Sequence, residues 1–146
     1  MNLQADREIS MELVEELRAQ VLGEVRFDEM SRALYSSDAS IYQIQPLGVV
    51  IPRTVEDVIS VMEAADRYGV PVLPRGGGTS LAGQTVGQAI VVDFSKYMRE
   101  TLEVNTEERW ARVQPGIVLD VLNDRLKIHG LMFAPDPSTS DRGNVG

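Results

Sequence analysis

The feature that most constrains the fold is a pair of short apolar runs with one amphipathic helix between them. Residues 47–51 form a continuous apolar run, which is typical of a buried strand. A helix is predicted to follow, capped by Thr54 together with Asp57 and terminated by Gly69. Residues 70–73 form the next apolar run. Because two buried strands joined by one helix make a βαβ unit, these strands are expected to be parallel.

The predicted elements on either side of this unit make the chain a mixed α/β protein. Before it, a helix is expected in residues 1–34, with Ser10 as its cap. After it come a third strand over residues 89–94 and an antiparallel hairpin over residues 101–113. A last helix is expected to open at Pro115-Gly116 and to stop at Gly130. The apolar stripes that we expect to face the core are Leu13, Val14, Leu17, Val21 and Leu22 in the first helix, Val55, Val58, Ile59, Met62 and Ala65 in the second, and Val118, Val121, Leu122 and Leu126 in the last.

The domain organisation follows from the same pattern. We expect a helical segment over residues 1–34 and one α/β domain over residues 35–146, with a passage from one lobe to another within residues 89–100. The chain stops directly after the loop-like residues 135–140, without a closing helix or strand. We therefore expect it to be a piece of a longer protein.

The composition excludes several classes of function. The 146 residues contain no cysteine, which excludes a disulfide scaffold, a zinc ribbon, an iron–sulfur cluster within this chain and a thiol nucleophile. The net charge of −8 argues against nucleic-acid binding, because neutralising phosphates requires a basic face. No apolar run approaches the roughly 18 residues of a membrane span, and the first 30 residues lack the apolar stretch of a signal peptide. A cytoplasmic location is therefore expected.

A glycine-rich loop from Arg75 to Gln88 carries the candidate chemistry. It follows a buried strand, where ligands commonly bind in α/β sheets, and the run Gly76-Gly77-Gly78 lets backbone N–H groups approach a phosphate closely. Two hydroxyl donors, Thr79 and Ser80, come next. Arg75 either supplies a positive charge at the rim or anchors the loop through carbonyl groups. The predicted ligand is a diphosphate, and the alternative is that the glycines form only a wide surface turn.

The loop differs from the common phosphate-binding motifs. A dinucleotide fingerprint would need a glycine where Leu81 stands. The residues from Gly78 to Gly83 have the spacing of a Walker A loop, but Gln84 stands where that motif has lysine. An NTPase is therefore not expected.

The residues from Pro74 to Gln84 resemble the pyrophosphate loop of FAD-linked oxidases with a PCMH-type (vanillyl-alcohol-oxidase-type) FAD-binding domain. Residues 38–40, 49–58, 113–116 and 133–140 agree with that family in the same order. The most similar branch contains the glycolate oxidase subunit, D-lactate dehydrogenase and D-2-hydroxyglutarate dehydrogenase. The resemblance implies the first lobe of such a domain plus the start of the second.

The resemblance also implies which residues bind FAD. The first loop would surround the pyrophosphate through backbone N–H groups, and a second loop would line the cofactor. The implied residues are Arg75, Gly76, Gly77, Gly78, Thr79, Ser80, Gly83 and Gln84 in the first loop, and Asp136, Pro137, Ser138, Ser140 and Gly146 in the second.

Two further expectations concern the chemistry. Members of the family that bind FAD covalently carry histidine where this chain has Thr79, so the resemblance implies non-covalent FAD. The single histidine, His129, is expected at a helix end in a capping or surface role. No catalytic base and no metal-ligand set is identifiable in the sequence, and the isolated chain is expected to be inactive.

Three functions remain open at this point. The first is the FAD-binding segment of an enzyme that oxidises a D-2-hydroxy acid by hydride transfer to FAD. The substrate would belong to the lactate, glycolate or 2-hydroxyglutarate class. The substrate domain would lie outside this chain, and an iron–sulfur partner or fused domain is expected. The second is a nucleotide- or phosphate-binding module without redox chemistry. The third is a purely structural α/β domain.

Overall fold

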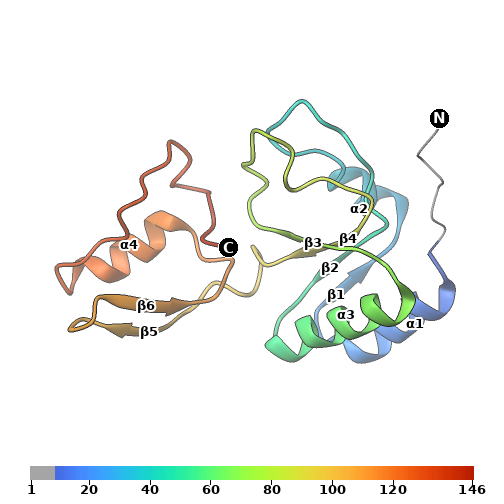
Figure 1. The fold of residues 1–146 in the computed structure, drawn as a ribbon, viewed down its shortest axis with the longest axis horizontal. Helices are drawn as coiled ribbons and strands as arrows, with labels where there is room; N and C mark the ends of the chain where they lie inside the picture. The colour runs from blue at the N-terminus through green and yellow to red at the C-terminus, as the bar shows by residue number, and fades with distance from the viewer. Residues whose placement is uncertain (1–8) are drawn as a thin grey trace.

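The computed structural model describes residues 9–146, which form two lobes joined by residues 95–100 (Figure 1). The fold is mixed α/β, as predicted. The first lobe, residues 9–94, contains α1 (Met11–Gln20), β1 (Glu24–Arg26), α2 (Glu29–Leu34), β2 (Gly48–Ile51), α3 (Val55–Tyr68), β3 (Val72–Arg75) and β4 (Ile90–Asp93). The second lobe, residues 101–146, contains β5 (Thr101–Asn105), β6 (Trp110–Val113) and α4 (Leu119–Lys127).

The first lobe is built on a four-stranded sheet with the order β1-β2-β4-β3. Strands β2 and β3 both run parallel to β4, so the predicted parallel arrangement is confirmed. They are not neighbours, however, because β4 lies between them. Strand β3 begins at Val72, two residues later than predicted, and continues to Arg75. Strand β1, which the sequence analysis missed, pairs antiparallel with β2 and brings residues 24–26 of the segment expected to be helical into this sheet.

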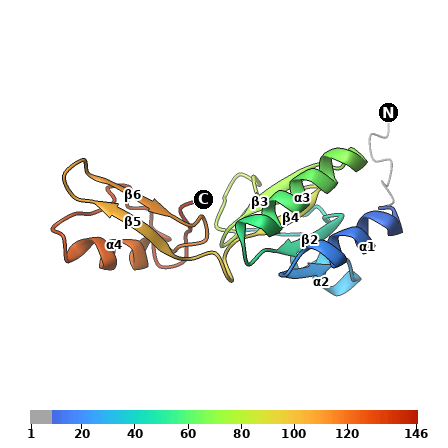
Figure 2. The same ribbon diagram turned by 90° about the horizontal axis from the view of Figure 1, so that it is seen from below.

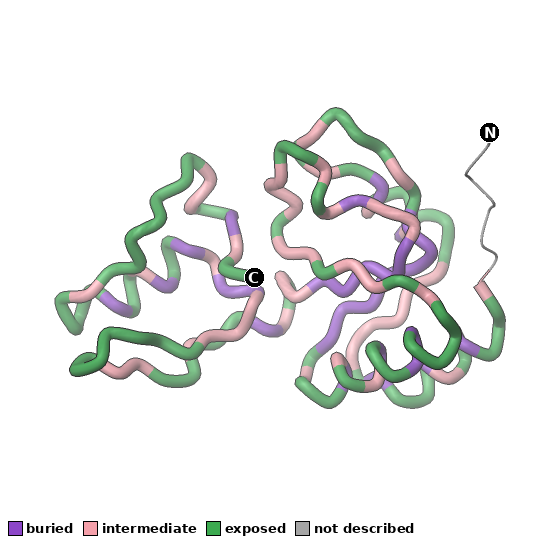
Figure 3. Tube along the Cα trace, in the orientation of Figure 1, coloured by how far each residue is buried: buried purple, intermediate pink, exposed green. Residues whose placement is uncertain are grey.

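The two faces of the sheet pack against different partners. Helices α1 and α3 lie together on one face (Figures 1 and 2). The central strands β2 and β4 are buried along their whole length, as the purple stretches of Figure 3 show. The core under the helices consists of Leu13, Leu17, Val21, Val50, Val61, Ala64, Ile90 and Val92. On the opposite face, Val49, Ile51 and Val91 pack with Tyr35, Leu73 and Tyr97.

Helix α3 has the predicted ends but buries a different face. Thr54 and Asp57 form the expected capping box, and Gly69 ends the helix in the left-handed conformation. The buried side chains are Asp57, Val61, Ala64 and Ala65, whereas the predicted core residues Val55, Ile59 and Met62 are 57%, 49% and 52% exposed. The predicted stripe was therefore wrong at these three positions. The small side chain of Ala64 lets the other face of α3 pack closely in the core with α1.

Asp57 explains part of this orientation. Its buried carboxylate accepts hydrogen bonds from the backbone N–H groups of Leu22 (2.8 Å), Gly23 (3.1 Å), Arg53 (2.8 Å) and Thr54 (3.4 Å). These donors come from the approach to β1 and from the start of α3. The carboxylate therefore ties the two segments together, which requires this side of α3 to face inward.

Helix α1 agrees with its prediction except at the end. The Ser10 side chain accepts a hydrogen bond from the Leu13 N–H (3.2 Å), and the predicted stripe is buried as far as Val21. Leu22 is 74% exposed, so its assignment to the core was wrong. It lies beyond the last helical residue, where the chain turns toward β1.

The second lobe is smaller. Strands β5 and β6 form the predicted antiparallel hairpin, and α4 packs beside it on a core of Ile117, Leu122 and Leu126. Helix α4 begins at Leu119, so the prediction that Pro115-Gly116 opens it was wrong by three residues. Val121 is 44% exposed and does not belong to the core, in contrast to the prediction. His129 lies exposed just after α4, as predicted.

Among residues 9–146, no helix is long and apolar enough to cross a membrane.

Candidate functional site

The candidate site is a cleft between the glycine-rich loop (residues 75–88) and the second loop (residues 131–146). In Figure 1 the C-terminal end of the chain lies between the two lobes. The cleft has a volume of about 480 Å³, within the range of roughly 300–1,000 Å³ that is usual for small-molecule sites. Its lining residues are 76–82, 84 and 85 from the first loop and Asn144 and Gly146 from the second.

The glycine-rich loop presents free backbone donors to this cleft. Within the described residues, none of the amide N–H groups of residues 77–80 donates a hydrogen bond to another protein group. The turn at Gly78 has a φ of +64°, a conformation that favours glycine. Because successive free N–H groups in a turn form a concave positive surface, this stretch can bind an anionic group such as a phosphate.

Arg75 anchors the loop from behind. Its guanidinium donates hydrogen bonds to the carbonyl oxygens of Ser37 (2.8 Å), Thr85 (3.0 Å) and Tyr35 (3.4 Å), and it lies 5.2 Å from the centre of the Tyr35 ring. A Cβ atom added to Gly78 would lie only 2.7 Å from the same guanidinium group, which is too close for an ordinary contact. Of the two roles considered for Arg75, the structure shows the anchor.

Residues 37–40 form a support for the loop that the sequence analysis did not assign. The Ala39 N–H donates to the Gly78 carbonyl oxygen (3.0 Å), and the Asp38 carboxylate accepts from the Thr85 hydroxyl (2.9 Å) and the Ser40 N–H (2.9 Å). Burial alone would raise the pKa of Asp38, but the hydrogen bonds from Ser40 and Thr85 outweigh it and hold the pKa below its ordinary value. The loop is therefore held from its start, its middle and its end.

The Tyr35 side chain extends this support to the end of β4. Its hydroxyl donates to an Asp93 carboxylate oxygen (2.6 Å), and the other oxygen accepts from the Ser95 N–H (2.7 Å). Burial first, and the hydrogen bond to Asp93 second, raise the pKa of Tyr35 well above its ordinary value. The phenol therefore stays protonated and keeps donating throughout the physiological pH range.

Asn144, which lines the cleft, lies close to the first glycines of the loop. Its side-chain N–H donates to the Gly116 carbonyl oxygen (2.6 Å), while its Oδ1 atom is buried without a hydrogen-bond partner among the described residues. A Cβ on Gly76 would lie 2.6 Å from that Oδ1, and a Cβ on Gly77 would lie 2.5 Å from the Arg142 carbonyl oxygen. The two glycines thus allow the loops of the two lobes to approach each other.

The structure brings only part of the predicted site residues into the cleft. Those that line it are Gly76, Gly77, Gly78, Thr79, Ser80, Gln84 and Gly146. Arg75 lies behind the loop, and a Cβ on Gly83 would meet the Tyr42 ring at 2.6 Å. Four predicted residues do not line the cleft: Asp136, Pro137, Ser138 and Ser140. Asp136, Pro137 and Ser138 are exposed. The Ser140 carbonyl oxygen accepts a hydrogen bond from the Asp120 N–H (3.1 Å).

The two hydroxyl groups of the loop differ in their availability. The Ser80 hydroxyl donates to Gln84 Oε1 and accepts the N–H groups of Ala82 and Gln84 (both 3.3 Å), so it stabilises the turn itself. The Thr79 hydroxyl makes no hydrogen bond with the described part of the chain and lines the cleft. Thr79 is therefore the hydroxyl that can contact a ligand.

The sequence analysis missed Leu81, Ala82, Thr85 and Asn144 in the lining. The first three lie inside the predicted loop, and their side chains carry no phosphate-binding pattern. Asn144 had a usable signal, since it stands between glycines in a segment with no predicted helix or strand. Most side-chain hydrogen bonds in proteins go to backbone groups or water, so a polar side chain in that setting is a candidate for a backbone contact.

The fold and the cleft define a class: an α/β ligand-binding domain in which a glycine-rich loop on a parallel sheet faces a loop from a second lobe. Residues 46–146 match the model of a family described as an FAD binding domain. The chain therefore belongs to the FAD-binding-domain family, which confirms the resemblance and identifies FAD as the family's cofactor.

Curated relatives agree with this assignment. The chain is 46% identical to D-2-hydroxyglutarate dehydrogenase of Pseudomonas putida over 127 residues, which is 85% of this chain and 13% of the relative. It is 35% identical to the glycolate oxidase subunit GlcD of Bacillus subtilis over 138 residues, which is 91% of this chain and 29% of the relative. The chain thus spans a small part of the proteins that it matches.

Solved structures show the same fold. The chain superposes on alkyldihydroxyacetonephosphate synthase with a TM-score of 0.82 and 24% identity, covering 99% of this chain and 30% of the other. For p-cresol methylhydroxylase with substrate bound, the TM-score is 0.70 at 18% identity, covering 90% of this chain and 27% of the other. The predicted PCMH-type architecture is confirmed by these likenesses.

Proposed function

We propose that this chain binds FAD non-covalently in the cleft between its two loops, as part of an enzyme that oxidises a D-2-hydroxy acid to the 2-oxo acid. The observation that carries the proposal is the run of free N–H groups at residues 77–80, opposite the Asn144 side chain. A pyrophosphate accepts hydrogen bonds from such a run, and it needs no side chain where glycines allow close approach.

The residues of the chain divide the binding between them. The N–H groups of residues 77–80 and the Thr79 hydroxyl donate to the pyrophosphate, while Arg75 and Asp38 hold the loop that presents them. The second loop closes the other side of the cleft with Asn144 and Gly146, and the expected contacts of Asp136, Pro137, Ser138 and Ser140 belong to the same proposal. Bound FAD would supply the acceptor for the hydride of the hydroxy acid.

The substrate class is inferred from the names of the relatives, which include enzymes for 2-hydroxyglutarate, glycolate and lactate. Because the chain spans 13% of the first relative, the substrate site is expected to lie in other parts of a longer protein. The inactivity of the isolated chain, a cytoplasmic location and an iron–sulfur partner or fused domain stay predictions.

The test is thermal unfolding of the chain with FAD, ATP or NAD, each titrated separately. A ligand present at 100 times its dissociation constant stabilises the folded state by about 2.7 kcal/mol, which shifts the melting temperature by several degrees. A shift with FAD alone supports the proposal. A shift with ATP instead favours the nucleotide-binding module without redox chemistry, and no shift with any ligand contradicts binding by these residues.

A pair of matched variants tests the location of the site. Gly77→Asp adds a negative charge beside the free N–H groups, and its Cβ would lie 2.5 Å from the Arg142 carbonyl oxygen of the second loop, so we expect FAD binding to be lost. Gly87→Asp adds the same charge near the end of the loop, outside the lining, where a Cβ makes only an ordinary contact of 3.5 Å with Leu73. Equal FAD affinity of the two variants would contradict the proposed site.

A further inference from the structure

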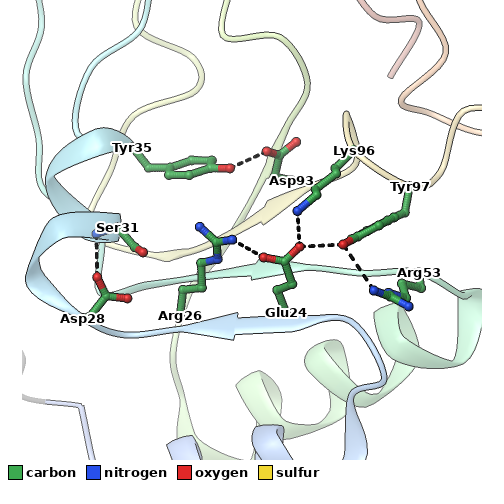
Figure 4. A network of polar contacts seen from close by, with 9 residues as sticks. All are labelled: Glu24, Arg26, Asp28, Ser31, Tyr35, Arg53, Asp93, Lys96 and Tyr97. Atoms are coloured by element: carbon green, nitrogen blue, oxygen red, sulfur yellow. Dashed lines mark hydrogen bonds and ion pairs between the residues drawn. The ribbon is translucent and has the colours of Figure 1, made fainter.

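A polar cluster on the first lobe holds the connection to the second lobe. Glu24, on the edge strand β1, accepts hydrogen bonds from Lys96, from the Tyr97 hydroxyl (2.7 Å) and from Arg26 (Figure 4). Lys96 and Tyr97 belong to residues 95–100, which join the lobes, so Glu24 bonds to the connection at two neighbouring residues.

Arg53 secures the same tyrosine from a second element. Its guanidinium lies 4.5 Å from the centre of the Tyr97 ring and donates to the Tyr97 hydroxyl (3.3 Å). The ring also packs against the buried face of the sheet formed by Val49, Ile51 and Val91. The start of the connection is therefore fixed to the first lobe by charge, by hydrogen bonds and by apolar contact.

Hydrogen bonds through Gly116 link the connection to the second loop. The Gly116 N–H donates to the Met98 carbonyl oxygen (2.9 Å), and Met98 is buried. A Cβ on Gly116 would overlap the Phe94 carbonyl oxygen, so this close approach requires glycine. The Gly116 carbonyl oxygen accepts the side-chain N–H of Asn144, the residue that faces Gly76.

A continuous set of contacts thus leads from β1 to the cleft, although Glu24 does not line the cleft. We propose that Glu24 is a positioning residue, which holds the connection through Lys96 and Tyr97 and thereby keeps the second loop at its place opposite the glycine-rich loop. Its effect on FAD affinity rests on the proposed function. Its effect on the arrangement of the lobes does not.

The charge of Glu24 is central to this role. The hydrogen bonds from Lys96 and Tyr97 lower the pKa of Glu24 from 4.5 to about 2, so the carboxylate is charged at neutral pH. Glu24→Gln keeps the size of the side chain and removes the charge. Tyr97→Phe removes one donor and leaves the ring, which can still pack against the sheet and Arg53.

A matched control lies elsewhere in the first lobe. On α1, Glu16 accepts hydrogen bonds from Arg67 and from the Tyr68 hydroxyl (3.2 Å), both on α3. This carboxylate has the same kinds of partner as Glu24, and its side chain is 17% exposed against 21% for Glu24. Its partners lie within the first lobe, so Glu16→Gln removes an equivalent interaction without touching the connection.

The experiment measures the distance between the lobes with a spin label on each. The chain contains no cysteine, so single cysteines introduced at the exposed positions Glu63 on α3 and Asp124 on α4 give specific labelling. We expect Glu24→Gln to broaden the distance distribution by electron–electron double resonance, and Glu16→Gln to leave it unchanged. An unchanged distribution in Glu24→Gln, or equal broadening in both variants, overturns the proposal.

The second arm measures FAD affinity by fluorescence titration of the unlabelled variants. Glu24→Gln is expected to raise the dissociation constant about tenfold, which is within the range found for residues that act without touching the ligand. Tyr97→Phe should raise it less, and the double variant should resemble Glu24→Gln, since both act through one contact. Broadening of the distances with unchanged FAD affinity would overturn the part of the proposal that connects Glu24 with the cleft.

The two proposals fail in different ways. If the unaltered chain does not bind FAD, the proposed function fails, and the distance measurement decides by itself whether Glu24 positions the second lobe. If the chain binds FAD and Glu24→Gln affects neither distance nor affinity, only the positioning role fails. A thermal melt of each variant shows whether the first lobe is still folded.

Discussion

The two sides of the cleft rest on supports of unequal strength. The glycine-rich loop follows β3 of a four-stranded sheet whose central strands are buried and covered by α1 and α3. The second loop follows α4, which packs on two strands, and Trp110, Ala111 and Arg112 of β6 are exposed. A two-stranded hairpin is marginally stable by itself and depends on what packs against it. The first lobe therefore holds its loop on a buried sheet, whereas the stability of the second lobe depends on α4 and on the attachment to the first lobe.

The largest change in unfolding free energy is expected when one leucine in each of the two hydrophobic cores is replaced. Leu17 is fully buried under the first sheet, and Leu122 is buried beside the hairpin. We expect Leu17→Ala to lower the free energy of unfolding by about 4 kcal/mol and Leu122→Ala by about 2 kcal/mol, because the smaller core can relax around the cavity. Urea unfolding measures both values.

Hydrogen exchange then shows where each variant opens. Leu17→Ala should lower protection throughout the chain, and Leu122→Ala only in residues 101–146. If Leu122→Ala weakened β2 and β4 as much as α4, the two lobes would unfold as one unit and the comparison would fail.

A smaller effect is expected from exchanging the helix caps. Thr54 caps α3 through its side chain, whereas Val118 at the same position of α4 makes no side-chain cap. We expect Thr54→Val to cost about 1 kcal/mol and Val118→Thr to stabilise by about 0.5 kcal/mol, because valine and threonine differ mainly in the hydroxyl that caps. Thermal melts measure both changes. The Leu119 and Asp120 N–H groups already donate to the Gly143 (3.0 Å) and Ser140 (3.1 Å) carbonyl oxygens of the second loop, so no gain from Val118→Thr would show that these two bonds are sufficient.

Another small effect is expected from pH on the attachment between the lobes. The folded-state pKa of Glu24, about 2, lies below its ordinary value of 4.5. The charged carboxylate therefore stabilises the folded state above about pH 4.5, and this contribution is lost as the pH falls toward 2. The charges that face it are Arg26 and Lys96, with the Tyr97 hydroxyl beside them.

The measurement is the difference in unfolding free energy between the unaltered chain and Glu24→Gln at several pH values. It should be about 1 kcal/mol or less at neutral pH, as for other partly exposed ion pairs, and it should shrink as the pH approaches 2. A difference that is independent of pH would show that the charge of Glu24 does not contribute.

Local structure was predictable wherever neighbouring residues decide it. The capping box of Thr54 and Asp57, the end of α3 at Gly69 and the hairpin of β5 and β6 all follow from residues close in sequence, and all are confirmed. The position of the glycine-rich loop directly after a strand was predictable for the same reason, although this strand, β3, lies at the edge of the sheet and is only partly buried, in contrast to the prediction. The family was also recognisable, since the motif residues appear in the same order along the chain.

Contacts between distant segments were not predictable. Periodicity shows that α3 has an apolar stripe with Val55, Ile59 and Met62, but it does not show that Asp57 turns the other side inward by bonding to Leu22 and Gly23. The apolar strands β2, β3 and β4 are compatible with several strand orders, so their sequences do not show that β4 lies between β2 and β3. In each case the deciding partner lies far away in the sequence.

The sequence by itself determined the two ends of α3, the hairpin of β5 and β6 and the family, because these depend on the chemistry of adjacent side chains and on glycine's backbone freedom. Only the tertiary structure decided that Arg75 anchors the loop through the Ser37 carbonyl oxygen and that Asn144 lies beside Gly76. The physical reason is that a hydrogen bond depends on position and direction in space. Chain segments such as residues 37–40 and 142–144 acquire these only when the sheet and the connection between the lobes place them beside the glycines.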